Sequence, residues 1–563
     1  MRKKLMKKTK FIIPIFVLSS LFLAGCNGSV NTADVTDSGF TESVTILDDT
    51  ITADFTLLDS SSNSIKPVGG VYSITSAGIY TASGKLSNGQ IYINAPSSQV
   101  ELYLSNVSIA NDSVSPIFVE NCTDFDLKAL KGSVNYIYDN RTTDYSLSDT
   151  DGRGAVYVAN GDLKVKGSGT LIITSLANSG IHGKDNVTVQ NVTMLIKAVN
   201  NGIRGNDKVT IKENPVIGIV CGNNGIVTHN SNLSNSGDNH GYIYIQGGSL
   251  TINSYGDGID AAYAIEISSG TDIEGNTYTP SIDIYTNKYS SYTVSSSPSL
   301  VRGGPGGHGG PGGGGFDGGG MEGGTSAEKS DTSAKALKAN EHINISAGQI
   351  YTYTYDDSIH TNTNSLDTSV TYSANINISG GTLRLKASDD AIHADKTLTI
   401  SGGDITVIES HEALEANIIN VSGGITNVFG SDDGVNASSA INVSGGYLEV
   451  SANPNGDTDG IDSNGTYTQT GGVVIAKGPN SRMAAAIDTD GAASISGGTI
   501  IILGEIGERG LTKGSGISSY SLSLHTSGNH TIKIDSVSYT ISNQYSYGKT
   551  QCYSSVKVIA DVN

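Results

Sequence analysis

Short apolar runs with alternating polar residues recur along most of the chain. Examples are NVTVQ from residue 186, KVTIKE from 208, TLTISGG from 397 and AINVSGG from 440. Alternation with a period of two is typical of β-strands that bury one face. Several runs end at Ser-Gly-Gly and are followed by a second short run, such as YLEVSA from 447. The pattern predicts many short strands and few helices.

A second pattern repeats at a longer interval. A small residue, usually Gly or Ala, precedes an aliphatic residue, and a polar residue follows it. Most copies lie 21 to 33 residues apart, but one interval spans 100 residues. The aliphatic residues of the repeat are Ile181, Ile203, Ile226, Ile259, Ile359, Ile392, Leu414, Val435, Ile461 and Ile487.

This repeat predicts an all-β, stacked architecture. A unit of two or three short strands cannot bury its apolar face alone, but stacked copies can. We therefore predict a parallel β-helix whose coils contain about 21–26 residues. The aliphatic residues would form an internal ladder, and the Gly-Gly pairs would form corners where a Cβ does not fit. A β-sandwich or a propeller is the alternative.

Composition divides the chain into segments. VRGGPGGHGGPGGGGFDGGGMEGG at 301–324 is of low complexity, and we assign residues 276–338 to a Gly-rich disordered insertion. The β-helix phrase resumes after it, so residues 46–519 are predicted to form one domain. From residue 520 the period is lost, and residues 520–563 are predicted to form a β cap over the open end.

The first residues of the chain predict where the protein is located. Met1 to Lys10 carry six cationic residues, an apolar run follows, and Leu-Ala-Gly-Cys ends at Cys26. This resembles the lipobox of bacterial lipoproteins and predicts a signal peptide over 1–25, lipidation of Cys26 and a tether over 26–45. We expect a lipid anchor at the extracellular face of the bacterial cell membrane. A signal peptide that is cleaved elsewhere is the alternative.

The charge balance limits the partners. The chain has 34 basic and 54 acidic residues, and removal of the signal peptide leaves a net charge of about −26. Such a chain repels phosphate backbones, so nucleic acid is not an expected partner. Cys122, Cys221 and Cys552 show no metal-binding spacing, although one disulfide is possible. We expect a monomer.

Acidic residues accompany the later copies of the repeat, two positions before and one position after the aliphatic residue. In stacked coils such side chains lie about 4.8 Å apart and repel by roughly 3.5 kcal/mol per pair at an effective dielectric constant near 20. Either some carboxyls hold protons or cations lie between the coils, and oxygen ligands favour Ca²⁺. The candidate metal ligands are Asp257, Asp260, Asp390, Glu412, Glu415, Asp433, Asn436, Asp459, Asp462 and Asp488.

Other roles are open for some of these positions. Asp and Asn before Gly are common turn residues, and the Asn pairs 200–201 and 223–224 favour an asparagine ladder without metal. Asp257 and Asp260 admit either interpretation. His182, His360 and His393 occupy the position after the aliphatic residue. We expect them to be neutral, hydrogen-bonded neighbours.

Several phrases together resemble a family of secreted carbohydrate-binding proteins, known chiefly from clostridia and described as cellulose- and pectin-binding β-helices. These phrases include GKLSNGQIYINAP, NSGIHGKDNVTVQ, GDGIDA and TDGIDSNGTYTQTGGVVIAKGP. The resemblance covers roughly residues 46–515 and implies a right-handed, pectate-lyase-like β-helix, bound calcium and affinity for plant polysaccharides. It implies calcium roles best for Asp257, Asp260, Asp459 and Asp462. Ser179, Asn201 and Asn224 depart from its Asp-Gly-Ile phrase.

An enzyme on the same fold is the main alternative. A polysaccharide lyase needs a base, usually Arg, beside a calcium-bound uronate. Arg204, Arg384 and Arg482 lie nearest the acidic phrases, but each suits a surface or ion-paired role, and we assign no catalytic residue. The chain has no Trp and 27 Tyr, so sugar stacking would rely on tyrosine. We predict non-catalytic, calcium-dependent polysaccharide binding; a lyase or a surface adhesin is the alternative.

Overall fold

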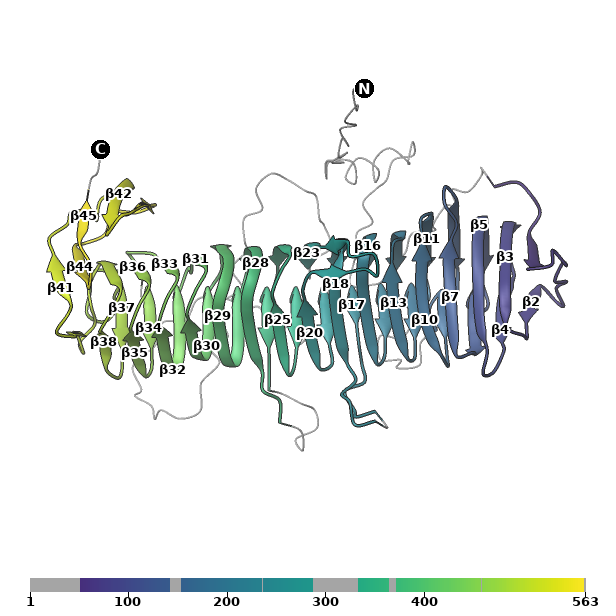
Figure 1. The fold of residues 1–563 in the computed structure, drawn as a ribbon, viewed down its shortest axis with the longest axis horizontal. Coiled ribbons are helices and arrows are strands. Elements are labelled where there is room, and N and C mark those ends of the chain that lie inside the picture. Colours follow the sequence, from purple (N-terminus) through teal and green to yellow (C-terminus); the bar gives the residue numbers. More distant parts are fainter. Residues whose placement is uncertain are drawn as a thin grey trace, which may run out of the picture.

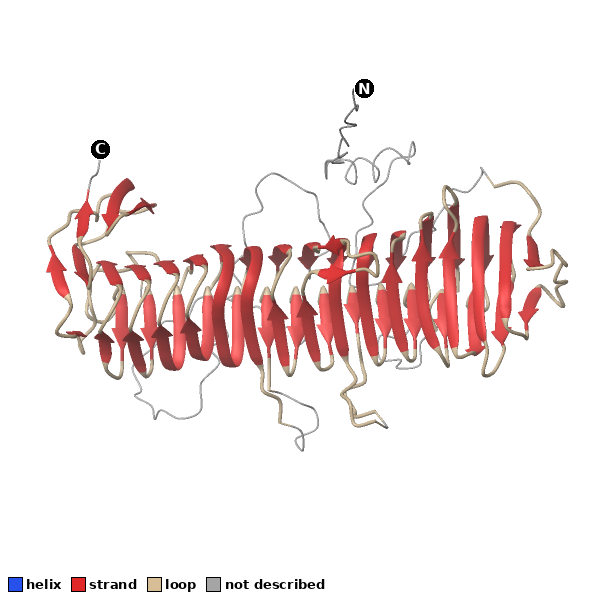
Figure 2. Ribbon diagram, viewed as in Figure 1, coloured by secondary structure: helices blue, strands red, loops and turns tan. Residues whose placement is uncertain are grey.

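The computed structural model describes residues 51–141, 153–234, 236–286, 333–363, 371–456 and 458–560, which form an elongated stack of short strands (Figure 1). In these ranges the structure contains strands and no helix, which confirms the predicted all-β class (Figure 2). Accordingly, no helix in the described ranges could cross a lipid bilayer. The predicted signal peptide, Cys26 and the tether lie outside the described residues.

The first strands begin the stack. β1 pairs antiparallel with β3 at the outer edge, whereas β2, β4, β6 and β9 pair in parallel, one after another. The edge of β3 is therefore covered rather than open. These strands are β1 (Thr56–Asp59), β2 (Val71–Ile74), β3 (Gly78–Leu86), β4 (Gln90–Asn94), β5 (Gln99–Asn111), β6 (Ile117–Asn121), β7 (Asp124–Ala129) and β8 (Val134–Asp139).

The central strands form rungs, each of which is a stretch of chain that adds one strand or strand segment to each of three faces. Every rung pairs in parallel with the next, as β12 does with β15 and β13 with β16. These strands are β9 (Val156–Val158), β10 (Asp162–Gly167), β11 (Thr170–Ser175), β12 (Ile181–Gly183), β13 (Asn186–Gln190), β14 (Thr193–Ala198), β15 (Ile203–Gly205), β16 (Lys208–Cys221), β17 (Ile226–Val227), β18 (Tyr242–Ser254), β19 (Ile259–Ala261), β20 (Ala264–Ile267), β21 (Gly270–Thr271), β22 (Thr277–Tyr278) and β23 (Ser281–Thr286).

The predicted insertion at 276–338 is too long at both ends. Ser281–Thr286 and Leu337–Ala339 are paired strands of the stack, because Ile282, Ile284 and Leu337 continue its buried columns. Residues 287–332 lie outside the described ranges. The strands that follow are β24 (Leu337–Ala339), β25 (His342–Ile345), β26 (Gln349–Thr354), β27 (Ile359–Thr361), β28 (Asn375–Ala387), β29 (Ile392–Glu409), β30 (Leu414–Val421), β31 (Ile425–Phe429), β32 (Val435–Val443), β33 (Tyr447–Ser451), β34 (Ile461–Ser463), β35 (Thr466–Gln469), β36 (Val473–Lys477), β37 (Ile487–Thr489), β38 (Ala493–Ile495) and β39 (Thr499–Leu503).

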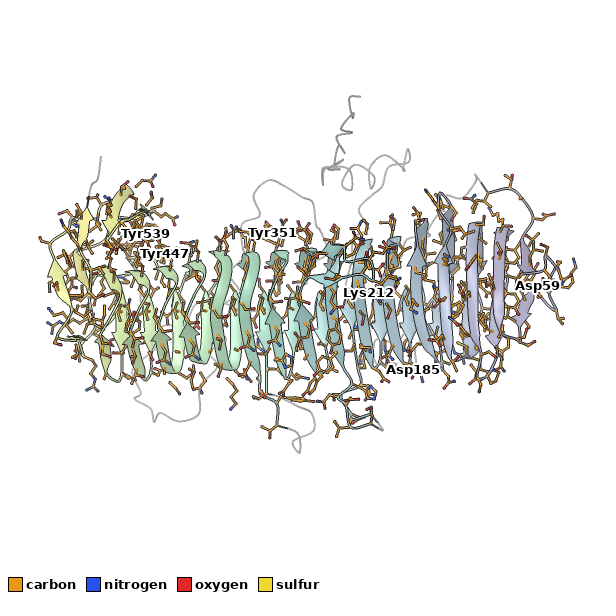
Figure 3. The ribbon with its side chains drawn as sticks, in the orientation of Figure 1. Asp59, Asp185, Lys212, Tyr351, Tyr447 and Tyr539 are labelled. Atoms are coloured by element: carbon orange, nitrogen blue, oxygen red, sulfur yellow. The ribbon has the colours of Figure 1, made fainter. Side chains whose placement is uncertain are left out.

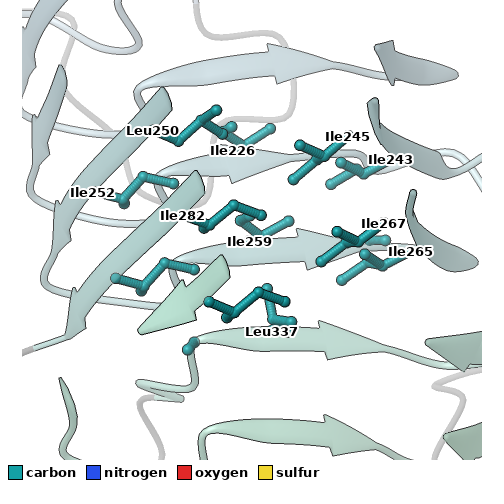
Figure 4. Packing of buried hydrophobic residues seen from close by; sticks show 14 of the residues in the cluster. Ile226, Ile243, Ile245, Leu250, Ile252, Ile259, Ile265, Ile267, Ile282 and Leu337 are labelled. Atoms are coloured by element: carbon teal, nitrogen blue, oxygen red, sulfur yellow. The ribbon is translucent and has the colours of Figure 1, made fainter. Parts of the chain in front are cut away.

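Buried aliphatic side chains from the three faces meet inside the stack (Figure 4). Each such side chain stabilises the fold by about 1.5–3 kcal/mol relative to exposure. We name the faces by their aligned residues. The Ile face carries the predicted ladder, which the structure confirms: Val156, Ile181, Ile203, Ile226, Ile259, Leu337, Ile359, Ile392, Leu414, Val435, Ile461 and Ile487. The second face carries Val187, Val209, Ile243, Ile265, Ile343, Ile376, Leu398, Ile419 and Ile441, and the third face carries Met194, Ile217, Leu250, Ile282, Ile350, Leu383, Ile405, Thr426, Leu448, Val474 and Ile500.

Gly-Gly pairs form the corners between the second and third faces, as predicted. A Cβ on Gly445 would lie 2.3 Å from the carbonyl oxygen of Ser422 in the preceding rung. Gly446, which follows it, has a φ of 78°, a region that side chains disfavour. Gly445 is therefore required by the close backbone contact between rungs, and Gly446 by the left-handed backbone conformation of the turn.

The last strands close the stack and cover part of its surface. β44 pairs antiparallel with β39, and the sheet of β42, β43 and β45 packs on the third face through Ile501, Ile532 and Ile541. The rings of Tyr447 and Tyr539 stack across this contact with centroids 5.5 Å apart (Figure 3). These strands are β40 (Leu511–Lys513), β41 (Ser518–Tyr520), β42 (Gly528–Ile534), β43 (Val537–Asn543), β44 (Thr550–Ser554) and β45 (Val558–Ala560).

The three described cysteines take no part in a disulfide. Cys122, Cys221 and Cys552 are buried free thiols in different parts of the stack. Burial raises the pKa of each thiol to about 12, so they stay protonated and pack as small apolar side chains.

Candidate functional site

Two columns of polar side chains run along the Ile face. The −2 column contains the residues two positions before each aliphatic residue, and the +1 column contains the residues immediately after. Backbone pairing aligns them from rung to rung, so that Asp462 lies opposite Asp488. All ten predicted ligand residues lie in these columns: Asp257, Asp390, Glu412, Asp433 and Asp459 in the −2 column, and Asp260, Glu415, Asn436, Asp462 and Asp488 in the +1 column.

Side-chain oxygens of the −2 column bind the backbone of the next rung. The N–H of Asp459 donates to Asp433 Oδ1 at 2.7 Å, and the N–H of Asn224 donates to Asn201 Oδ1 at 3.1 Å. Buried backbone donors need such partners, and an amide oxygen serves as well as a carboxylate. This contact explains the asparagines of the first half, but it does not explain why later rungs carry charge.

The predicted repeat does not include the rung of Leu337, which brings two lysines into the columns. Leu337 lies between Ile259 and Ile359 in the ladder, so Lys335 and Lys338 occupy the −2 and +1 columns. The segment AKALKA at 334–339 shares the Ala-aliphatic-polar-Ala form of DAIHA at 390–394. That form could have revealed the rung, although it lacks an acid there.

These lysines supply counter-charge to the neighbouring acids. Lys338 Nζ lies 3.4 Å from Asp257 Oδ2, and Lys335 Nζ lies 2.8 Å from Asp357 Oδ2. Burial raises the pKa of Asp260 to about 6, while Lys338 opposes the rise. The two lysines offset part of the negative charge of this region, and a calcium role for Asp257 and Asp260 stays a prediction.

The contacts of His393 favour its protonated form, which differs from the expectation that it is neutral. Its Nδ1 lies 3.2 Å from Asp390 Oδ2 and 3.0 Å from Glu415 Oε2. Burial alone would lower the pKa of His393, but hydrogen bonds to Asp390, Asp395 and Glu415 raise it well above its usual range. Burial lowers the pKa of His360, which favours its neutral form. Asp390 and Glu415 therefore have a protein counter-charge.

Glu412 and Asn436 are bound to each other. Asn436 Nδ2 lies 3.2 Å from both carboxylate oxygens of Glu412. Burial, followed by the charges of Glu415 and Asp433, raises the pKa of Glu412 to about 8. Glu412 also has an oxygen within 4.8 Å of ligand atoms of His411 and Asp432. The amide nitrogen of Asn436 thus serves as a donor to Glu412.

The last acids of the columns form no ion pair within the described part of the chain. We call Asp433, Asp459, Asp462 and Asp488 the C-terminal acid group. Among the described residues, none of the ion pairs within 4 Å includes any of these four. Burial first, and then neighbouring carboxylates, raise the pKa of Asp433 to about 7, of Asp459 to about 8 and of Asp462 to about 6. Their ionised forms repel one another near neutral pH.

The donor chemistry of this group fits a hard divalent cation. Carboxylate oxygens are the ligands that Ca²⁺ prefers, and Ca²⁺ accepts six to eight oxygens, including carbonyls and water. The side chains are half-buried, which leaves water access to them. The rungs from Asp257 to Glu415 fit Ca²⁺ less well, because lysine and histidine nitrogens already occupy the space between their carboxylates.

The arginines considered as lyase bases have other positions. Arg384 lies on the third face and pairs with Asp404, with 3.0 Å between Nη2 and Oδ2. Arg204 is buried in the +1 column, and its Nε donates to Asn206 Oδ1 at 3.0 Å. Arg482 is exposed. We assign none of them a catalytic role.

Comparison with known proteins shows to which family the chain belongs. A family model described as "Carbohydrate-binding domain-containing protein" matches residues 68–373 and 362–413, which together span more than half of the chain. The chain belongs to this family. The matched ranges include Asp257, Asp260, Asp390 and Glu412 of the columns. The C-terminal acid group lies beyond the part that this carbohydrate-binding domain family model covers.

Two similar proteins match parts of the chain. A relative from Acetivibrio thermocellus, also described as a carbohydrate-binding domain-containing protein, is 27% identical over 192 residues. The match covers 34% of this chain and 65% of that relative, which is less than two thirds of its length. A solved structure of a "polysaccharide lyase-like protein from C. thermocellum", a gadolinium derivative, is 24% identical, covers 42% of this chain and 92% of that chain, and has a TM-score of 0.35.

Proposed function

We propose that this protein binds polysaccharide of the cellulose or pectin type without cleaving it, and that calcium supports the binding. The observation that carries the binding proposal is the family match over residues 68–413. The relative from Acetivibrio thermocellus carries the same carbohydrate-binding description. The long, regular faces of the stack offer a surface on which a linear polymer can make repeated contacts.

We infer that the rungs wind as a right-handed parallel β-helix. The parallel pairing of successive rungs on three faces supports this inference. Parallel strands joined by a crossover follow a right-handed path in nearly all proteins, because strand twist favours that hand. Such a winding keeps one side of every rung on the same face of the molecule.

The proposed calcium site is the C-terminal acid group. Asp433, Asp459, Asp462 and Asp488 would hold the ion, which supplies positive charge that lets them ionise together and attracts a uronate carboxylate. The raised pKa values of Asp433 and Asp459 support this, because they indicate carboxylates that need a cation at neutral pH. An acidic protein could then bind an acidic polymer.

We propose that the protein acts at the cell surface, held by a lipid on Cys26. The lipobox-like end of the apolar run supports this assignment. Cys26→Ser is expected to move the protein from the membrane fraction into the medium. An unchanged membrane fraction would contradict the lipid anchor and leave the glycan-binding proposal untouched.

A pull-down assay tests the function. The protein without its first 26 residues is mixed with insoluble cellulose or immobilised pectin, in calcium or in excess chelator. We expect retention on at least one of these polymers, with retention on pectin lost in chelator. Full retention on pectin in chelator contradicts the calcium requirement. Retention on neither polymer contradicts glycan binding and favours an adhesin, and unsaturated products from polygalacturonate would identify a lyase.

A further inference from the structure

An open groove of about 370 Å³ lies where the C-terminal strands overhang the third face. β29, β31 and β33 form its floor, and the end of β43 with the residue just beyond it forms one wall. This volume is within the range of about 300–1,000 Å³ that is common for small-ligand sites. The residues of the floor and of the wall are separated by about ninety or more positions, so only the folded chain brings them together. Those that the following argument uses are Ile408, Asn427, Phe429, Glu449, Thr540 and Ser542.

The wall of the groove is firmly attached to its floor. Lys477 Nζ donates to the backbone oxygen of Ser542 at 2.7 Å and also pairs with Glu449. The rings of Tyr447 and Tyr539, which are labelled in Figure 3, stack nearly parallel beside this contact. Lys477 is 1% exposed, so its ion pair is shielded from salt and water. The groove is therefore a built feature rather than a gap between loose segments.

The groove presents apolar and hydrogen-bonding groups together. Ile408 is 47% exposed and, with the half-buried ring of Phe429, forms an apolar patch in the floor. Asn427, Thr540 and Ser542 place an amide and two hydroxyls around this patch. Sugar rings have an apolar face and a polar rim, and apolar pockets with a few placed polar groups suit such ligands.

The charge of the groove argues against a polyanion. Among the described residues that line it, Glu449 is the one acidic or basic side chain, and it forms an ion pair with the buried Lys477. The described lining of the groove contains no lysine or arginine. A uronate polymer would meet a paired carboxylate and no lysine or arginine in this lining, whereas the amide of Asn427 and the hydroxyls of Thr540 and Ser542 can bond to the hydroxyls of a neutral glycan.

We propose that this groove binds a neutral polysaccharide chain, as a subsite distinct from the C-terminal acid group. The proposal rests on the proposed function, since it names the class of glycan that one part of the surface recognises. The floor begins at Thr406, and most of the lining lies beyond residue 413, where the family match ends. The subsite is thus a feature of this chain that the family match does not assign.

Two exposed isoleucines of the third face provide a matched test. Ile408→Asp places a charge in the floor of the groove, and Ile425→Asp places the same charge on an isoleucine that is 51% exposed and does not line the groove. Binding is measured by titration with a soluble β-glucan, a xylan, a mannan and polygalacturonate, each in calcium and in chelator. Thermal unfolding of both variants checks that they fold.

We expect Ile408→Asp to weaken binding of the preferred neutral glycan about tenfold or more, because the charge must be desolvated under the sugar ring. Ile425→Asp should bind as the unmodified protein does. Neutral-glycan binding should persist in chelator, because no residue of the C-terminal acid group lines the groove. Equal binding by both variants overturns the subsite and leaves the proposed function standing.

A fluorescent reporter gives an independent measurement. The chain contains no Trp, so Thr540→Trp introduces a single tryptophan, which can be excited selectively over tyrosine, at the groove wall, and Ser538→Trp introduces one on the same strand outside the lining. We expect the neutral glycan to shift the emission of the first variant only. A protein that binds polygalacturonate alone overturns the neutral-glycan assignment. A protein that binds no glycan in any condition overturns the proposed function itself.

Discussion

Substitution of Asp459 by Asn tests whether charge in the −2 column needs a metal ion. Asn keeps the oxygen that accepts the hydrogen bond from the backbone N–H of Ala485 in the next rung, so the ladder contact survives. Only the charge is removed. In calcium-free protein above neutral pH we expect Asp459→Asn to stabilise the fold, which is the reverse of the usual effect of a substitution at a half-buried polar position.

The structure sets the size of the effect. Equivalent positions on neighbouring strands lie about 4.8 Å apart, and two unit charges at that distance repel by roughly 3.5 kcal/mol at a dielectric constant near 20. Burial and the charges of Asp433, Asp462 and Asp488 raise the pKa of Asp459 to about 8. Solvent reaches this half-buried group and screens its charge, so we expect a stabilisation of about 1–3 kcal/mol. At roughly 2 cal/mol/K of unfolding entropy per residue, this corresponds to about 1–3 °C in Tm.

The assay is thermal unfolding followed by circular dichroism at pH 8.5, in chelator and in calcium. Calcium at about one hundred times its Kd should raise the stability of the unmodified protein by about 2.7 kcal/mol, and that of Asp459→Asn by clearly less. Asp357→Asn is the matched control in the same column. Because Asp357 pairs with buried Lys335, its loss should destabilise the protein equally in both conditions.

One pattern of results would refute this reasoning. If Asp459→Asn lowers Tm in chelator, and calcium raises the Tm of both proteins by the same amount, the carboxylate serves only as a hydrogen-bond acceptor. The C-terminal acid group would then be no calcium site. Calcium binding measured by calorimetry would show the same stoichiometry for both proteins in that case.

Three further predictions follow from the columns and the corners. The folded-state pKa values of Asp433 and Asp459, about 7 and 8, lie above the usual value of 3.8. The stability of the metal-free protein should therefore fall as pH rises from about 4 to 8, and the calcium-induced rise in Tm should grow over the same range. A calcium effect on Tm that does not change with pH would contradict this. Lys338→Met should lower the free energy of unfolding, measured in urea, by about 3–5 kcal/mol, because it leaves Asp257 and Asp260 without their cation. A change below about 1 kcal/mol would show that the lysine is dispensable. Gly445→Ala should lower the free energy of unfolding by about 1–3 kcal/mol, because the added Cβ clashes with the preceding rung. Ser444→Ala, at the exposed neighbouring residue, should change stability little. Equal Tm values for the two variants would show that the corner relaxes.

The repeat made the core of the fold predictable. The spacing of residues such as Ile181, Ile203 and Ile461 was sufficient to align the Ile face, because a strand in a parallel stack must present the same side at every rung. The Gly-Gly corners were predictable for the same reason. The rung of Leu337 was missed because its polar neighbours are lysines, although Ala-Leu-Lys-Ala fits the phrase.

The candidate site was predictable only in part. Its columns follow from the repeat, but their charge balance depends on contacts across long stretches of chain. Lys335 meets Asp357 in the next rung, and Lys338 meets Asp257 from 81 residues away. A single repeat unit therefore could not show which acids already have a cation and which do not.

The amino-acid sequence alone determined the strands, their register on the Ile face and the positions of the carboxylates, because these follow from local alternation and from a period that every rung repeats. The tertiary structure decided which carboxylates are neutralised by lysine or histidine, and where the C-terminal strands overhang the third face. Electrostatic energy and groove shape depend on distances between side chains of different rungs, and those distances exist only once the chain is folded.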